Sequence, residues 1–124
     1  MIWTYGETHL TRFLHDLNNF SLTLKYTHHH SRQAVDFLDL TIFKSALFPY
    51  TNVLDTKTFQ KAHNLYQYLH YSSNHERSRY KAIIIGELIR YVRTNTLKQD
   101  YQAMTNLLKT RLEAREYPSR LVER

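Results

Sequence analysis

The scarcity of glycine and proline constrains this chain more than any other feature. Its 124 residues contain only two of each. Because these residues supply most tight turns, their scarcity favours long helices and argues against a sandwich or barrel of many short strands. Hydrophobic residues make up 42% of the chain and aromatic residues 14%, which suffices for one globular core. We therefore expect a folded chain built from a few elements.

Cysteine is absent, so disulfides and thiolate metal sites are excluded. The sequence shows no signal peptide, and no apolar run reaches the ~18 residues that a membrane-spanning helix requires. We expect an intracellular protein of the nucleus or cytoplasm, with no membrane contact and no cofactor.

Positive charge is concentrated in the second half of the chain. Residues 1–62 contain six Lys/Arg and five Asp/Glu, whereas residues 63–124 contain eleven and six, a net charge of +5. A basic half-chain favours a polyanionic partner, with nucleic acid ranked before a membrane.

The first half is expected to form a helix followed by a small sheet. Apolar residues at helical spacing predict a helix over 7–18. Alternating or β-branched stretches predict strands over 22–27, 35–43 and 53–59, with a longer hairpin connection around Pro49. These strands would form a three-stranded antiparallel meander.

The second half is expected to be helical. A helix is predicted over 76–94, with Ser72, Ser73 or Asn74 as the N-cap, and another over 97–115, followed by a turn and a short helical segment. The apolar stripe of the helix over 97–115 consists of Tyr101, Met104, Leu108 and Leu112. The fold class is therefore α+β, an N-terminal helix and meander followed by a helical bundle.

The helix over 76–94 has two contrasting sides. Its expected core-facing residues are Tyr80, Ile84, Ile85, Leu88, Ile89, Tyr91 and Val92. At about 100° per residue, a sector roughly 80° wide on the opposite side contains Arg79, Ala82, Gly86, Arg90 and Arg93.

This arginine sector is the strongest candidate site in the sequence. Arginine makes bidentate contacts with phosphate, and the small Ala82 and Gly86 would let an extended anion approach the helix backbone. Lys81 and Arg77 complete the candidate set. The alternative is a solvated face on which Glu87 pairs with Arg90.

Other polar groups give no catalytic or metal site. In a strand only His28 and His30 of the triplet 28–30 could share an ion, so we expect these histidines to be merely exposed. Asp36 and Asp39 would lie on opposite faces of one strand. No glycine-rich phosphate loop and no catalytic triad is present.

Several stretches together carry a resemblance to a known family. They are "VDFLDLTIFKS", "VLDTKTFQKAHNLYQYLHYSSNHERSRYKAIIIGELIRYVRTN" and "REYPSRLV", preceded by "MIWTYGETHLTRFLHDLNNFSLTLKYT". The chain resembles the segment that follows the catalytic Tyr-x-Asp-Asp motif in reverse transcriptases of Penelope-like retroelements, where an animal helix-turn-helix domain lies.

The resemblance implies a palm remainder over 1–62 joined to a helical thumb over 63–124. A thumb of this kind grips a primer–template duplex of RNA or DNA through its phosphates, so the rest of a reverse transcriptase is a further implied partner. The family's paired catalytic aspartates would lie before residue 1, so the chain by itself is expected not to be an enzyme.

The chain departs from the family pattern at three turns. Glu76 and Ala62 stand where the family has proline, and Glu116 stands where it has glycine. If Glu116 requires a positive φ, it costs ~1 kcal/mol relative to glycine.

Two alternatives stay open. One is a free-standing helix-turn-helix module that binds nucleic acid without a polymerase. The other is an interaction domain that docks another chain through the aromatic residues Tyr66, Tyr68 and Tyr71.

Overall fold

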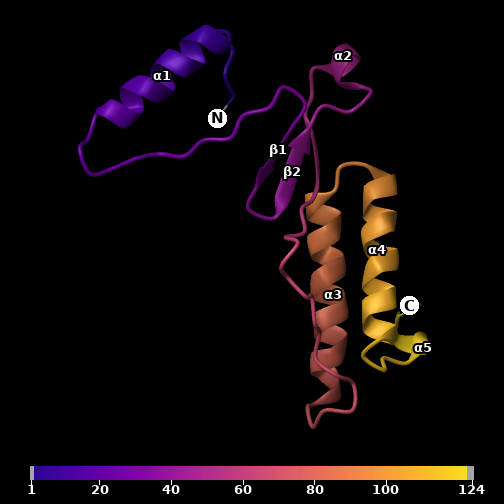
Figure 1. Cartoon of the computed structure of the whole chain (residues 1–124). Coiled ribbons are helices and arrows are strands. Elements are labelled where there is room, and N and C mark those ends of the chain that lie inside the picture. Colours follow the sequence, from indigo (N-terminus) through magenta and orange to yellow (C-terminus); the bar gives the residue numbers. More distant parts are fainter. Residues whose placement is uncertain (1, 123–124) are drawn as a thin grey trace. The chain divides into compact units, whose positions relative to one another are not determined.

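The computed structural model describes residues 2–122, the side chain of Val122 excepted. The chain comprises two compact units, Met1–His30 and Ser31–Arg124 (Figure 1). The fold class is α+β as predicted, with an N-terminal helix, a three-stranded antiparallel meander and a C-terminal helical pair. The division at residue 62 into palm and thumb stays a prediction.

The first unit is built around helix α1, Glu7–Asn19, which confirms the predicted helix. Glu7 lies in the first turn, where its negative charge interacts favourably with the positive end of the helix dipole. No residue of α1 is buried, and its Phe13 ring contacts that of Trp3, with ring centroids 5.3 Å apart.

The strand predicted over 22–27 is wrong, because this segment is irregular. Leu22 and Leu24 are 99% and 58% exposed. The segment is held to α1 by Asn18, whose side chain bonds the backbone N–H and C=O of Tyr26. Alternation of apolar and polar residues yields a strand only where a neighbouring strand pairs with it, and none does so within the described residues.

The second unit contains the sheet, with strand order β1-β2-β3. Strand β1 is Ala34–Phe37, β2 is Leu40–Phe43 and β3 is Asp55–Thr58. The single strand predicted over 35–43 is therefore a hairpin, with Phe37 paired to Leu40 across the turn. Leu38 adopts a positive φ of 58° there, a conformation that leucine rarely takes, so composition gave no turn signal.

The connection between β2 and β3 contains the short helix α2, Phe48–Thr51. Pro49 lies in its first turn. A backbone N–H in that turn has no acceptor within the helix, so the N–H that proline lacks is not missed. Asn52 ends the helix in the left-handed conformation. The predicted long hairpin connection is confirmed.

Two long helices follow, α3 over Arg77–Thr94 and α4 over Lys98–Glu113, with α5 over Ser119–Val122. Figure 1 shows α3 and α4 side by side and antiparallel. The predicted N-caps were wrong: Glu76 holds that position without a side-chain cap. Ser73 instead accepts a hydrogen bond on its carbonyl from the Tyr80 hydroxyl.

The core of the second unit lies between the helices and the segment that precedes them. Its buried residues are Tyr80, Ile84, Tyr91, Leu108, Leu112 and Tyr117. Met104 and Tyr101 pack against this cluster, which confirms the predicted stripe of α4. Tyr71, Tyr80 and Tyr117 form an aromatic group with ring centroids 4.9–5.7 Å apart.

The turn between the helices joins them to the sheet. Asn95 accepts a hydrogen bond from the Thr58 N–H and donates to the Thr58 hydroxyl, while Thr96 bonds Thr56 through both backbone and side chain. Thr58 and Thr94 hydroxyls meet at 2.6 Å. The outer edge of β3 is therefore covered by polar groups of this turn.

Glu116 has a φ of 63° just after α4, as the resemblance implied. The Tyr117 N–H bonds the Leu112 carbonyl, and the Glu116 N–H bonds the Glu113 carbonyl. This pair of bonds is the Schellman arrangement, in which glycine is the usual residue at the position of Glu116.

Candidate nucleic-acid interface

The outward face of α3 is the surface on which the predicted site lies. We define this face by seven of its exposed residues, Arg79, Ala82, Ile85, Gly86, Ile89, Val92 and Arg93. The opposite side contains the core residues Tyr80, Ile84 and Tyr91. Helical spacing of 3.6 residues per turn places these two sets on opposite sides of one helix.

Three residues predicted to face the core are on this surface instead. Ile85, Ile89 and Val92 are 55%, 46% and 63% exposed. The reason is geometric: α4, β3 and the tyrosine-rich segment before α3 cover only one side of the helix. Apolar residue type alone does not say which part of a broad apolar sector is covered.

Arg90 differs from the other arginines of the predicted sector. Its guanidinium lies 3.7 Å from the Asp39 carboxylate at the β1–β2 turn and 3.5 Å from Glu87. Its side chain is only 33% exposed. Arg90 thus links α3 to the hairpin, and it forms the pair with Glu87 that the alternative of a solvated face predicted.

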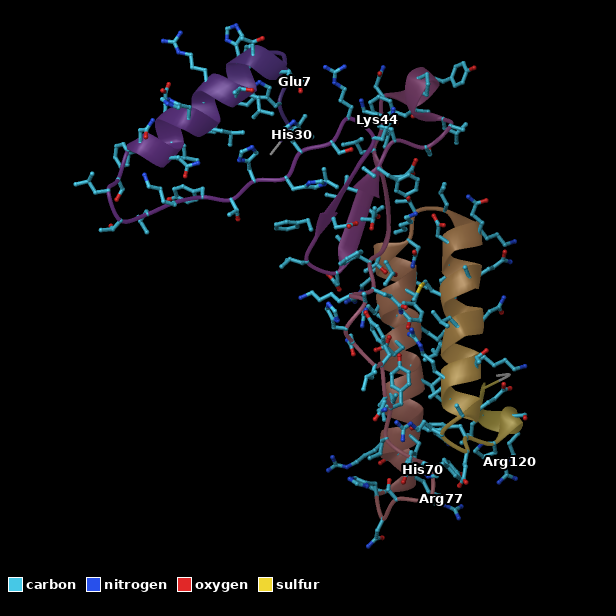
Figure 2. All side chains as sticks on the ribbon, viewed as in Figure 1. Glu7, His30, Lys44, His70, Arg77 and Arg120 are labelled. Carbon is cyan, nitrogen blue, oxygen red and sulfur yellow. The ribbon has the colours of Figure 1, made fainter. Side chains whose placement is uncertain are left out.

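The remaining predicted cations are exposed. Arg77, Arg79, Lys81 and Arg93 form no ion pair within residues 2–122. Figure 2 shows Arg77 at the end of the helical pair where α3 begins, together with Arg120 of α5, a cation that periodicity did not single out. These side chains are free to meet an anion.

Charge on the outward face has one sign. Glu87 is the only acidic residue of α3, and its side chain is 20% exposed on the covered side. No carboxylate of α3 therefore offsets its exposed cations.

Gly86 has open space around it. A Cβ built there would meet nothing within 4 Å, so close packing inside this unit does not require glycine. Glycine inside a helix costs ~1 kcal/mol relative to alanine. Among the described residues no close contact at Gly86 offsets this cost, which fits a surface that something else approaches closely.

A polar cluster beneath α3 escaped sequence analysis. Burial, and then the neighbouring Tyr68 hydroxyl and Glu87 carboxylate, raise the pKa of Tyr91. Arg111 of α4 donates to Gln60 and lies over the Tyr66 ring at 4.3 Å. Long-range pairing of this kind leaves no periodic signal.

This cluster changes the interpretation of the aromatic segment. Tyr68 and Tyr71 pack against the core, and Tyr66 lies under Arg111. The aromatic docking face proposed from sequence is therefore occupied by contacts within the chain.

The three histidines 28–30 are exposed, as expected. His28 and His30 rings stack at 5.9 Å, and His30 lies 3.8 Å from Glu7 (Figure 2). Asp36 accepts a hydrogen bond from Thr41, and Asp39 pairs with Arg90, so each carboxylate has a structural contact. No helix among residues 2–122 is both long and apolar enough to cross a membrane.

Comparison with known protein families finds a match for the helical part of the chain. Residues 67–124 match the family model described as "Animal helix-turn-helix domain". This range contains α3, the turn Asn95–Leu97, α4 and α5. No curated protein and no solved structure matches the chain significantly. The match confirms the helix-turn-helix domain expected from sequence, and nothing in the comparisons links the chain to Penelope-like reverse transcriptases.

Proposed function

We propose that the helix-turn-helix domain binds nucleic acid by contacting its phosphate backbone with the outward face of α3. Arg79 and Arg93 are the principal contacts, Arg77 and Lys81 add flanking charge, and Gly86 allows close approach. The observation that supports this most strongly is that every charged side chain on the outward face of this 18-residue helix is a cation. The domain match points to the same class of partner.

The spacing of the arginines suits an extended polyanion. Arg79 and Arg93 are separated by about 21 Å along the helix axis at 1.5 Å per residue. A single strand of B-DNA presents about six phosphates over that length. One helix laid along a backbone would therefore meet phosphates at both of its ends.

Binding should depend little on base sequence. The 18 residues of α3 contain no asparagine or glutamine, the residues that read adenine, and its exposed centre is apolar. The helices are antiparallel neighbours, unlike the near-perpendicular pair that inserts its second helix into the major groove. Both features favour backbone contact over base recognition.

A salt titration of duplex binding tests the proposal. Each phosphate contact contributes about 0.9 to the slope of log affinity against log salt, so Arg79→Gln with Arg93→Gln should flatten it by about 1.8. Arg90→Gln is the matched control, because its guanidinium is paired to Asp39 and should leave the slope unchanged. An unchanged slope in a folded double variant would contradict the proposal.

A second candidate is the thumb of a reverse transcriptase, with residues 1–62 as a palm remainder. The sequence resemblance and the order of elements, a small α+β segment before a helical pair, support it. In this case too the chain alone would not polymerise. A reading frame upstream of Met1 that encodes a Tyr-x-Asp-Asp palm would support this candidate. Upstream sequence that encodes no such palm would favour the free-standing helix-turn-helix module instead.

A further inference from the structure

An apolar ridge runs along the middle of the outward face of α3. We define this ridge as Ile85, Ile89 and Val92, which lie at i, i+4 and i+7. All three are β-branched and about half exposed, at 55%, 46% and 63%. A contiguous apolar strip on a folded surface marks an interaction site more often than a scattered apolar residue does.

Cations border the ridge on both sides. At about 100° per residue, Arg79 and Arg93 lie along one border and Lys81 along the other. All three are exposed, and the only carboxylate of the helix is on the covered side. A second copy of the chain docked ridge to ridge would bring these cations together, which disfavours self-association.

The surface beside the ridge is shallow. Ala82 and Gly86 are exposed, and space at Gly86 is open. Small residues let the backbone of a second helix approach, and apolar residues at this spacing interdigitate with those of a helical partner. The ridge offers no hydrogen-bonding group, so the polar floor of a nucleic-acid groove would be desolvated without compensation against it.

Within the second unit, helix α3 is covered by α4, by β3 and by the tyrosine-rich segment that precedes it, and its remaining side is open. A third helix on that side would complete a three-helix arrangement. We propose that the ridge docks an amphipathic helix of a partner protein, whose apolar face covers Ile85, Ile89 and Val92 and whose bordering Asp/Glu residues meet Arg79, Arg93 and Lys81. This inference does not rest on nucleic-acid binding.

The test uses the full chain and two synthetic helical peptides as long as α3. Both carry leucines at i, i+3, i+4 and i+7, bordered by glutamates in one peptide and by lysines in the other. Measured by fluorescence anisotropy, the glutamate peptide should bind at least about tenfold more tightly than the lysine peptide. Its glutamates meet the cations on both borders of the ridge, whereas the lysines of the other peptide are repelled by them.

Variants assign the binding to the ridge. Ile85→Gln with Ile89→Gln should lower the affinity for the glutamate peptide by about tenfold or more, because the central apolar anchors are lost. Leu107→Gln on α4, at a position 37% exposed, is the control and should leave the affinity unchanged. The duplex salt slope reports only charged contacts, and the ridge variant leaves Arg79 and Arg93 in place, so the slope tests the nucleic-acid contact separately from the peptide affinity.

Three results would overturn the inference. Equal affinity for the two peptides would remove the charge argument, and peptide binding that survives the ridge variant would move the site elsewhere. Dimers that appear with rising concentration and vanish in the ridge variant would identify a second copy as the occupant. Duplex affinity that falls as strongly as peptide affinity in that variant would identify nucleic acid.

Discussion

The covered side and the outward face of α3 contain the same residue types in opposite surroundings. Ile84 is 7% exposed, whereas its neighbour Ile85 is 55% exposed. Arg90 is held by Asp39 and Glu87, whereas Arg93, less than one turn away, is exposed. Because successive residues are rotated by about 100° around the helix, neighbouring residues of one type can differ, one held in structural contacts and the other exposed and available to a ligand.

This comparison teaches that residue type and helical period do not assign a role by themselves. The covered side is defined by groups far away in sequence: Asp39 in the β1–β2 turn, Thr58 in β3 and Leu108 in α4. The outward face is what these partners leave uncovered. The function proposed for this face therefore rests on its exposure, its charge and its small residues together.

The largest expected effect separates the two isoleucines. Ile84→Ala should lower the free energy of unfolding by about 2–5 kcal/mol, because it opens a cavity in the core. Ile85→Ala should change it by less than about 1 kcal/mol, since the side chain is already half in water. Urea denaturation followed by circular dichroism measures both. Equal losses would mean that the outward face is buried in solution.

A smaller effect is expected at the joint between the helical pair and the sheet. Asn95→Ala removes the acceptor of the Thr58 N–H and the donor to the Tyr91 carbonyl, at 3.0 and 2.8 Å. The Tyr91 carbonyl keeps its bond from the backbone N–H of residue 95, so the Thr58 N–H left unpaired should lower stability by about 1–3 kcal/mol. Asn106→Ala on the exposed side of α4 is the control, with an expected change below about 0.5 kcal/mol. If the two variants unfold alike, the joint contributes nothing measurable.

The smallest effect concerns the residue after α4. Glu116→Gly should raise stability by about 0.5–1 kcal/mol, because glycine accepts a positive φ without steric strain. The exposed contact of Glu116 with His70 at 3.8 Å offsets little of this gain. A denaturant midpoint that stays in place or falls would contradict the strain argument.

Helices and their order were predictable from sequence because amphipathic spacing is a local signal. The bounds of α1, α3 and α4 lie close to those predicted. Strands were less predictable: residues 22–27 have no pairing partner, and the β1–β2 turn at Leu38 contains neither glycine nor proline. Strand pairing depends on contacts that a single segment does not encode.

The candidate site was predicted in part. Exposure of Arg77, Arg79, Lys81, Gly86 and Arg93 agrees with the predicted cationic face. The different position of Arg90 depends on Asp39, and the exposure of Ile89 depends on the covering elements of the unit all lying on the other side of α3. Neither follows from helical period, so both needed the structure.

The most direct test of the central claim, that the outward face of α3 contacts nucleic acid, uses the chain's two glycines as reporters. Gly86 lies on that face, and Gly6 precedes α1. Addition of a short duplex at low salt to the ¹⁵N-labelled chain should shift the amide resonance of Gly86 and leave that of Gly6 in place. The shift should disappear in the Arg79→Gln, Arg93→Gln variant. A Gly86 resonance that stays in place while the duplex binds would contradict the account.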